Sequence, residues 1–161
     1  MNNLPPDTLN AIGVLTRREV EVRLLIPLIE ALSTRFGREE VLSVVRQTIV
    51  EIARQQGTQL AESCPINDLQ AFASTLENWK KGGAMDIQVI EQNSHRFSFD
   101  VHRCRYAEMY QALGVPELGR LISCSRDFAL VEGFNPAIRL MRTQTILEGA
   151  VACDFRYELI R

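Results

Sequence analysis

The sequence predicts an α+β fold in which an N-terminal helical layer packs on a four-stranded, mainly antiparallel sheet. Apolar residues recur at helical spacing through the first half of the chain, and strict alternation replaces this pattern near residue 84. Two alternating runs are then joined by a polar turn that contains asparagine, which is typical of a β-hairpin. Helices followed by strands favour an architecture in which the helices cover one face of the sheet.

The length and composition are those of one globular domain. The chain has 161 residues, of which 46% are hydrophobic and 24% are charged. We expect a single domain over 1–161, with an arm (1–15), a helical part (16–83) and a part that carries the sheet and the site (84–161). A chain of this length can bury roughly 70% of its unfolded surface, so it needs no disulfides to fold.

The helical part contains three predicted helices. Thr16 and Glu19 match the capping-box pattern that marks the start of a helix. Pro27 falls inside this first helix, where it is expected to cause a kink, and Gly37 is expected to end it. Gly57 is expected to end the second helix. The predicted helices span residues 16–36, 38–56 and 68–79.

The remaining part combines strands with helices. The alternating residues 85–89 and 97–101 predict the hairpin, and a polar turn over 92–95 connects them. The other expected elements are helices over residues 105–113 and 116–127 and strands over residues 138–143 and 151–159.

Two arginines are placed on the apolar faces of their strands by the two-residue period. Arg103 and Arg142 each continue a run of apolar residues on one face, so both are expected to point toward the covered side of the sheet. Burying a guanidinium is costly unless it has a partner. The partner is either an internal carboxylate, such as Asp127 or Glu148, or a small carboxylate ligand, which Arg can bind through two parallel hydrogen bonds.

The cysteines are the other candidates for chemistry, and their spacing fits no zinc site. Cys153 is expected on the covered face of the last strand. Cys124 and Asp127 lie three residues apart on a predicted helix and so share one face, whereas Arg126 is expected to point elsewhere. Cys64 precedes a proline in a predicted loop, and we assign it no role. The four cysteines are Cys64, Cys104, Cys124 and Cys153.

Charge and motifs limit the classes of partner. A net charge of -2 argues against nucleic acid as the main partner, and no apolar run approaches the roughly 20 residues that span a bilayer. The first residues lack a secretory signal pattern, so we expect a cytoplasmic protein with reduced thiols and no membrane partner. Walker, GxSxG and HExxH patterns do not occur, and we expect neither a cofactor nor a metal. A homo-oligomer is compatible with this composition.

Several blocks of the sequence occur in the order typical of one family. They are Arg103–Tyr110, Leu113–Leu118, Cys124–Asp127, Gly133–Pro136, Arg142–Thr145, Glu148–Gly149 and Cys153–Tyr157. These blocks resemble the L-2-amino-thiazoline-4-carboxylic acid hydrolase family, and the likeness extends from about Thr16. The resemblance implies hydrolytic opening of a small heterocyclic carboxylate. For the name-giving substrate, the C–S bond at the amidine carbon breaks and N-carbamoyl-L-cysteine forms.

The resemblance and the face assignments together suggest roles for individual residues. Cys153, or Cys124 as the second choice, would be the nucleophile that attacks the electrophilic carbon. Asp127 would hold the amidine or orient a base, and Arg103 and Arg142 would anchor the carboxylate of the substrate. Further candidate substrate contacts are Cys104, His102, Glu148 and Asp154.

Two alternatives stay open at this level. In the family a histidine often precedes the last cysteine, whereas this chain has Ala152. If that histidine is the general base of the family, either this chain has lost the base or His102 or Asp127 does its work. The second class of hypothesis is a non-catalytic module that binds a small ligand or a metal in the same pocket. Three cysteines with His102, Asp127 and Asp154 could bind zinc, but Cys153 and Asp154 are expected on opposite faces of their strand.

Overall fold

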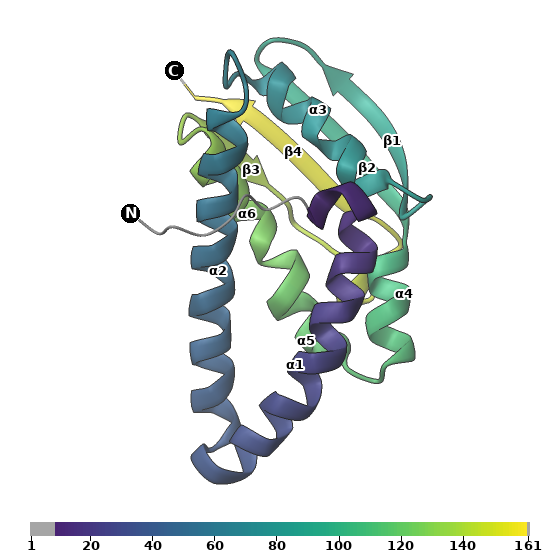
Figure 1. Ribbon diagram of the computed structural model, residues 1–161. Helices are drawn as coiled ribbons and strands as arrows, with labels where there is room; N and C mark the ends of the chain where they lie inside the picture. Colours follow the sequence, from purple (N-terminus) through teal and green to yellow (C-terminus); the bar gives the residue numbers. More distant parts are fainter. Residues whose placement is uncertain (1–8, 161) are drawn as a thin grey trace.

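The computed structural model describes residues 9–160 and confirms the α+β fold (Figure 1). Most of the expected arm lies outside the described residues, and the described end of the arm forms the 3-10 turn η1. The helical part contains α1 (Val14–Phe36), α2 (Arg38–Glu62) and α3 (Leu69–Lys80), after η1 (Leu9–Ile12). The second part contains β1 (Met85–Gln92), β2 (Arg96–Cys104), α4 (Arg105–Ala112), α5 (Pro116–Gly119), the π-helical turn η2 (Arg120–Cys124), α6 (Arg126–Phe134), β3 (Ile138–Met141), the 3-10 turn η3 (Ile146–Glu148) and β4 (Cys153–Leu159).

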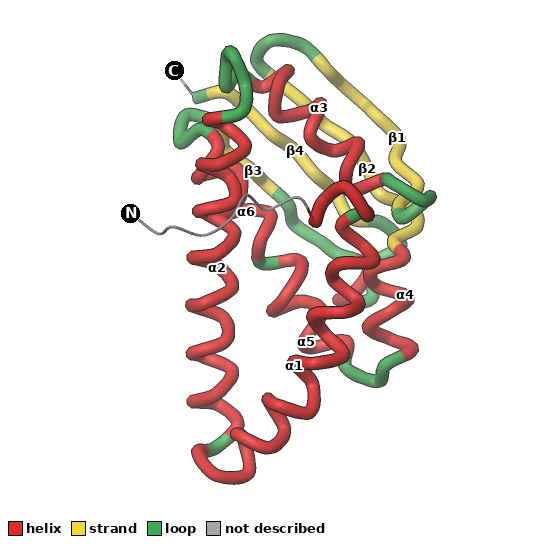
Figure 2. Tube along the Cα trace, in the orientation of Figure 1, coloured by secondary structure: helices red, strands yellow, loops and turns green. Residues whose placement is uncertain are grey.

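The four strands form one antiparallel sheet in the order β1-β2-β4-β3. β2 and β4 lie at its centre, where Phe99 pairs with Phe155 and Val101 pairs with Cys153. Helices α3 and α6 pack on the apolar face of the sheet and bury it, as Figure 2 shows for α3. The buried core there includes Leu69, Phe72, Leu76, Phe97, Phe99, Leu130, Phe134, Leu140, Phe155 and Tyr157.

A second apolar cluster joins α1 and α2 to the helices that follow β2. The two long helices form an antiparallel hairpin about Gly37, which has φ +87° and donates its amide to the carbonyl of Ser33 at 3.0 Å. An L-residue would be strained at this φ, so glycine fits the turn. The cluster contains Val22, Ile29, Val41, Ile49, Tyr110, Leu118, Leu121 and Ile122. The chain is therefore built around two apolar cores.

The predicted start of the first helix is wrong. α1 begins at Val14, directly after Gly13, and no side chain caps it. Thr16 consequently lies inside the first turn, and the Thr16–Glu19 pattern occurs within a helix that has already started. The helix continues through Pro27 to Phe36, where Gly37 ends it as expected.

The predicted end of the second helix at Gly57 is also wrong, because α2 continues to Glu62. Gly57 is buried where α2 crosses α6, and a Cβ at this position would lie 2.1 Å from the carbonyl oxygen of Leu130. Gly133 of α6 lies equally close to α2, since a Cβ at this position would lie 2.0 Å from the carbonyl oxygen of Arg54. The two glycines allow the helix backbones to touch, so Gly57 is a packing residue and not a helix end.

A β-bulge in the hairpin changes which side chains face the helices. Asp86 of β1 pairs with Arg103, whereas the next residue, Ile87, pairs with Val101, so His102 is an extra residue in β2. One extra residue inverts the alternation beyond it. Cys104 therefore points toward the covered side of the sheet, where the unbroken period places Arg103.

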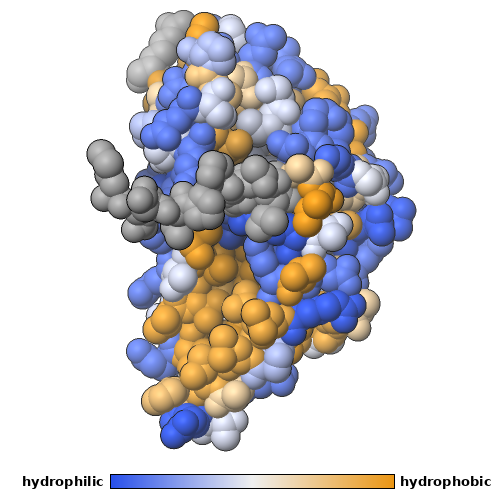
Figure 3. Space-filling model, viewed as in Figure 1, coloured by the Kyte–Doolittle hydropathy of each residue, from blue (hydrophilic) through white to orange (hydrophobic). Residues whose placement is uncertain are grey.

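Apolar side chains also gather on the outer face of the α1–α2 hairpin (Figure 3). The exposed apolar residues of the two helices include Val20, Leu24, Leu28, Val44 and Ile52. None of these lines the cavity described below. Within residues 9–160, no helix is both long enough and apolar enough to cross a membrane.

Candidate functional site

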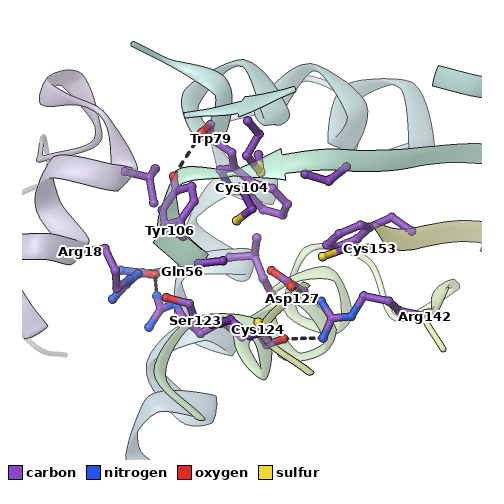
Figure 4. Close-up of a pocket in the computed structure, with 18 of the residues that line it drawn as sticks. Arg18, Gln56, Trp79, Cys104, Tyr106, Ser123, Cys124, Asp127, Arg142 and Cys153 are labelled. Carbon is purple, nitrogen blue, oxygen red and sulfur yellow. Dashed lines mark hydrogen bonds and ion pairs between the residues drawn. The ribbon is translucent and has the colours of Figure 1, made fainter. Parts of the chain in front are cut away.

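A cavity of about 320 Å³ lies between the helices and the covered face of the sheet (Figure 4). Its walls come from α1, α2, α3, α4, η2 and α6 on the helical side and from β1, β2, β4 and η3 on the sheet side. Most lining residues are apolar or aromatic, including Leu60, Trp79, Met85, Val101, Tyr106, Ile146 and Phe155. A secluded apolar cavity with a few polar groups is the usual form of a small-molecule site.

Three thiols from separate segments line this cavity. Cys104 lies at the end of β2, Cys124 at the end of η2 and Cys153 at the start of β4, and all three are free. Cys153 is buried, and its Sγ accepts a hydrogen bond from the backbone N–H of Ile146 at 3.2 Å. A donated N–H stabilises negative charge on sulfur, so this contact favours a thiolate at Cys153.

Burial raises the pKa of all three thiols, but to different extents. It raises the pKa of Cys104 to about 11. The pKa of Cys124 is raised further, by burial and by the negative charge of Asp127. Burial also raises the pKa of Cys153, while the amide of Ile146 and the positive charge of Arg142 oppose the change. At Cys153 a backbone amide and a positive charge thus act together against the effect of burial.

Arg142 forms a buried ion pair with the carboxylate of Asp127. Its guanidinium also donates to the carbonyl oxygen of Cys124 at 3.0 Å and lies over the rings of Phe128 and Phe155, 5.1 and 5.0 Å from their centroids. The Arg142 side chain is only 7% exposed. Of the two partners expected for a buried arginine, the structure contains the internal carboxylate, so Arg142 holds Asp127 in position.

The negative charge of Asp127 acts on all three thiols, because it raises the pKa of Cys104, Cys124 and Cys153. Burial raises the pKa of Asp127 itself, although Arg142 opposes this change. Asp127 lines the cavity, and 19% of its side chain is exposed. A carboxylate with a raised pKa is a better proton acceptor near neutral pH than an ordinary aspartate.

The sequence matches the model of the L-2-amino-thiazoline-4-carboxylic acid hydrolase family over residues 17–157. The chain belongs to this family. The match spans the three cavity thiols, Asp127 and Arg142, and it confirms the resemblance seen in the sequence blocks. A comparison with curated proteins found no match.

The fold is similar to that of a solved structure. This is the crystal structure of trafficking protein particle complex subunit 3 from Naegleria fowleri, covalently bound to palmitic acid. The two chains share 13% sequence identity with a TM-score of 0.52, and the likeness covers 89% of this chain and 97% of the other. At this identity the similarity shows the fold alone.

Arg103 and His102, both expected to contact the substrate of this family member, lie outside the cavity. Arg103 is exposed and pairs with Glu108 at 2.7 Å, so its predicted position on the covered face is wrong. His102 is exposed as well, and its Nε2 lies 3.0 Å from the side-chain oxygen of Gln88. The cause is the bulge at His102, which turns Arg103 outward and Cys104 inward.

Glu148 and Asp154 are likewise not among the residues that line the cavity. Glu148 accepts a hydrogen bond from the hydroxyl of Thr145 at 2.7 Å. Asp154 accepts from the backbone amides of Thr143 and Gln144 at 2.9 and 2.8 Å. It also accepts from the hydroxyl of Thr143 at 2.6 Å. Burial alone would raise the pKa of Asp154, but the hydrogen bonds from this hydroxyl and from the two amides outweigh burial and lower it. Both carboxylates shape the loop between β3 and β4 that carries Arg142 to the cavity.

The prediction from sequence missed two buried arginines that line the cavity, Arg18 and Arg126. Arg18 lies four residues before Val22, so helical spacing alone places it on the buried stripe of α1. Arg126 was expected to point away from the site because one continuous helix was predicted through it. That expectation is wrong, since η2 is π-helical and the chain restarts as α6 after Ser125, with Arg126 and Asp127 both lining the cavity.

The metal-bound alternative has no cluster to support it in the part of the chain that the structure describes. Within residues 9–160, no group of three or more histidine, cysteine, aspartate or glutamate side chains is arranged to hold a metal ion. His102 and Asp154, two of the ligands considered for zinc, do not line the cavity with the thiols. The polar groups that line the cavity therefore include the three thiols, the ion pair of Arg142 with Asp127, and the buried arginines Arg18 and Arg126.

Proposed function

We propose that the chain is a ring-opening hydrolase that acts on a small heterocyclic carboxylate containing a cyclic amidine, with Cys153 as the nucleophile. One observation carries this proposal: a thiol that accepts a backbone hydrogen bond shares a secluded cavity with a buried carboxylate, in a chain of a hydrolase family. The mechanism needs a free thiol, which fits a reducing compartment such as the cytoplasm.

The first half of the proposed reaction opens the ring. Asp127 accepts the proton of Cys153 as Sγ attacks the amidine carbon, which becomes bonded to the enzyme. The bond between this carbon and the ring sulfur then breaks, and its electron pair leaves with the sulfur. Asp127 returns the proton to the departing sulfur. The product of this half-reaction is an isothiourea joined to Cys153.

The second half releases the product with one molecule of water. Asp127 accepts one proton from the water as its oxygen adds to the amidine carbon, and the second proton moves to the amidine nitrogen. The bond to Sγ then breaks, and Asp127 passes its proton to Cys153. For a thiazoline substrate the product is an N-carbamoyl amino acid with a free thiol. The raised pKa of Asp127 supports both proton transfers.

The test is turnover of a panel of thiazoline, imidazoline and hydantoin carboxylates, followed by mass spectrometry. Cys153→Ser is expected to fold normally and to lower turnover by at least about a hundredfold, because a hydroxyl is a far weaker nucleophile than a thiol. Cys64→Ser is the matched control, since Cys64 does not line the cavity. Full turnover in Cys153→Ser would remove Cys153 from the nucleophile role, and Cys124→Ser would then test the second candidate.

A second candidate function is non-catalytic binding of an apolar ligand in the same cavity. The apolar lining favours it, and burial keeps the three thiols protonated at neutral pH. The trafficking protein of similar fold is itself covalently bound to palmitic acid. If this function is the correct one, a ligand will raise the melting temperature while no member of the panel is converted.

A further inference from the structure

One end of the cavity carries buried positive charge at a distance from the thiols. Figure 4 shows Arg18 and Gln56 at one end, with Cys153 and Arg142 at the other. Arg18 is 4% exposed and Arg126 is 9% exposed, and both line the cavity. Arg18 comes from α1 and Arg126 from the start of α6, so two separate helices bring guanidinium groups to the same place.

The carboxylates of the described residues do not balance this charge. Arg18 pairs with Glu21, but Glu21 also accepts from Arg17 at 2.9 Å and so is shared. Arg126 donates to the side-chain oxygen of Gln56, and no ion pair of Arg126 occurs within residues 9–160. Among the described residues, Arg18 thus has a carboxylate partner that it shares with Arg17, whereas Arg126 is in hydrogen-bond contact with an amide oxygen and forms no ion pair.

The electrostatic cost of this arrangement is visible at Arg126. Burial, together with the positive charges of Arg18 and Arg17, lowers the pKa of Arg126 to about 10, although the negative charges of Glu21 and Asp127 oppose the change. An uncompensated buried guanidinium is unfavourable unless an anion completes the site. Arginine can also bind a carboxylate through two parallel hydrogen bonds, which fixes the orientation of the anion. This end of the cavity is suited to an anionic group.

Most of the side chains that line the cavity are apolar or aromatic. They include Leu60, Trp79, Met85, Tyr106, Leu130 and Leu147. A volume of about 320 Å³ exceeds what a single small heterocycle fills, and an apolar wall offers a polar ligand no hydrogen bonds. The ligand therefore needs an apolar body beyond its charged group.

We propose that the cavity binds an elongated amphipathic anion, whose carboxylate is held by Arg18 and Arg126 and whose apolar body extends toward Cys153. This inference deepens the proposed function and rests on its use of the same cavity, since it names the class of substrate. The substrate carries its heterocycle at Cys153 and its carboxylate at the arginines, with an apolar group between them. In 2-amino-thiazoline-4-carboxylate the carboxylate is attached directly to the ring, so this compound has no apolar group between the two.

Binding of simple probes to the wild-type protein tests charge and length separately. Octanoate has the charge and the apolar body, acetate has the charge alone, and octylamine has the body with the opposite charge. Isothermal titration calorimetry at pH 7 is expected to show octanoate binding at least tenfold more tightly than either of the others. Equal affinity for octylamine and octanoate would overturn the proposal without the use of any variant.

Variants then locate the anion. Arg126→Gln is expected to weaken octanoate binding at least tenfold, because it removes the charge that pairs with the carboxylate. Arg126→Lys keeps the charge and should restore part of the affinity. Arg139→Gln is the matched control, since Arg139 is exposed on β3 outside the cavity and its loss should leave affinity unchanged. Wild-type affinity in a folded Arg126→Gln variant would contradict the assignment.

The outcomes separate this inference from the proposed reaction. Octanoate binding that depends on Arg126, together with no turnover of any heterocycle, would uphold the ligand class and reject the hydrolase. Turnover that depends on Cys153, together with octanoate binding that is indifferent to Arg126, would uphold the hydrolase and reject the ligand class.

Discussion

The guanidinium of Arg142 is bound to the carboxylate of Asp127, and both side chains line the cavity that contains the three thiols. The guanidinium also donates to the carbonyl oxygen of Cys124, so two of its five N–H groups have these acceptors. Its positive charge opposes the effect of burial on the pKa of Cys153 and of Asp127. Arg142 therefore positions Asp127 and alters the pKa of the reactive groups, while Arg18 and Arg126 bring further positive charge to the cavity.

Loss of Arg142 is expected to destabilise the fold strongly. Arg142→Gln leaves the Asp127 carboxylate buried without its partner, which typically costs about 3–5 kcal/mol of unfolding free energy. Adding Asp127→Asn removes the stranded charge and should recover much of that loss, so the double-mutant cycle in urea is expected to show coupling of about 1 kcal/mol or more. Arg103→Gln is the control, because it breaks an exposed pair with Glu108 and should leave stability unchanged. Additive effects at Asp127 and Arg142 would contradict the pairing.

The reactivity of Cys153 toward alkylation should depend on pH in a characteristic way. Because burial raises the pKa of Cys153, the thiolate forms only above the ordinary range of about 8.5, and the iodoacetamide rate should keep rising past that pH. The same shift makes the folded state lose stability as the pH rises through the thiol range. Arg142→Gln should move the pH midpoint of the alkylation rate higher, since it removes a positive charge that stabilises the thiolate of Cys153. Peptide mass spectrometry gives the rates, and the chain unfolded in urea is the reference; a midpoint below the reference would refute this assignment.

Gly57→Ala tests the close approach of α2 and α6. In an exposed helix this change would add about 1 kcal/mol of stability, because alanine is the better helix former. Here the new Cβ would lie 2.1 Å from the carbonyl oxygen of Leu130, and the backbone must shift to make room. We expect a loss of about 1–3 kcal/mol, typical of overpacking, in thermal or urea unfolding. Gln55→Ala, at an exposed position of α2, should change stability by less than about 0.5 kcal/mol. A stabilised Gly57→Ala variant would show that the helices can separate at no cost.

Local patterns in the sequence were sufficient to predict the hairpin, the last strand and most helices. Phe97, Phe99 and Phe155 alternate with polar residues, and the structure buries all three on the covered face of the sheet. Gly37 ends α1 as predicted, because a positive φ is a local property of the turn. Such features depend on a few neighbouring residues, which is why the fold class could be inferred from one sequence.

The site was harder to predict because it depends on contacts between distant segments. The bulge at His102 depends on pairing with β1, and it exchanges the faces of Arg103 and Cys104. Gly57 has the local appearance of a helix end, and only its contact with α6 explains it. The approach of Arg18 to Arg126 joins α1 to α6 across more than half of the chain, and no spacing in the sequence encodes it.

Arg126→Met separates a ligand-binding role of Arg126 from a structural one. If the arginine awaits an anion, replacing it with an apolar side chain removes the cost of burying an uncompensated charge, and the ligand-free protein should gain about 1 kcal/mol of unfolding free energy. Octanoate should then stabilise the wild type but not the variant, because only the wild type binds it. Arg139→Met, at an exposed site, should leave both measurements unchanged. If Arg126 served the fold through its hydrogen bond to Gln56, the same variant would lose on the order of 1–3 kcal/mol, since the amide oxygen would be left without its donor. The sign of the change in urea unfolding therefore decides between the two roles.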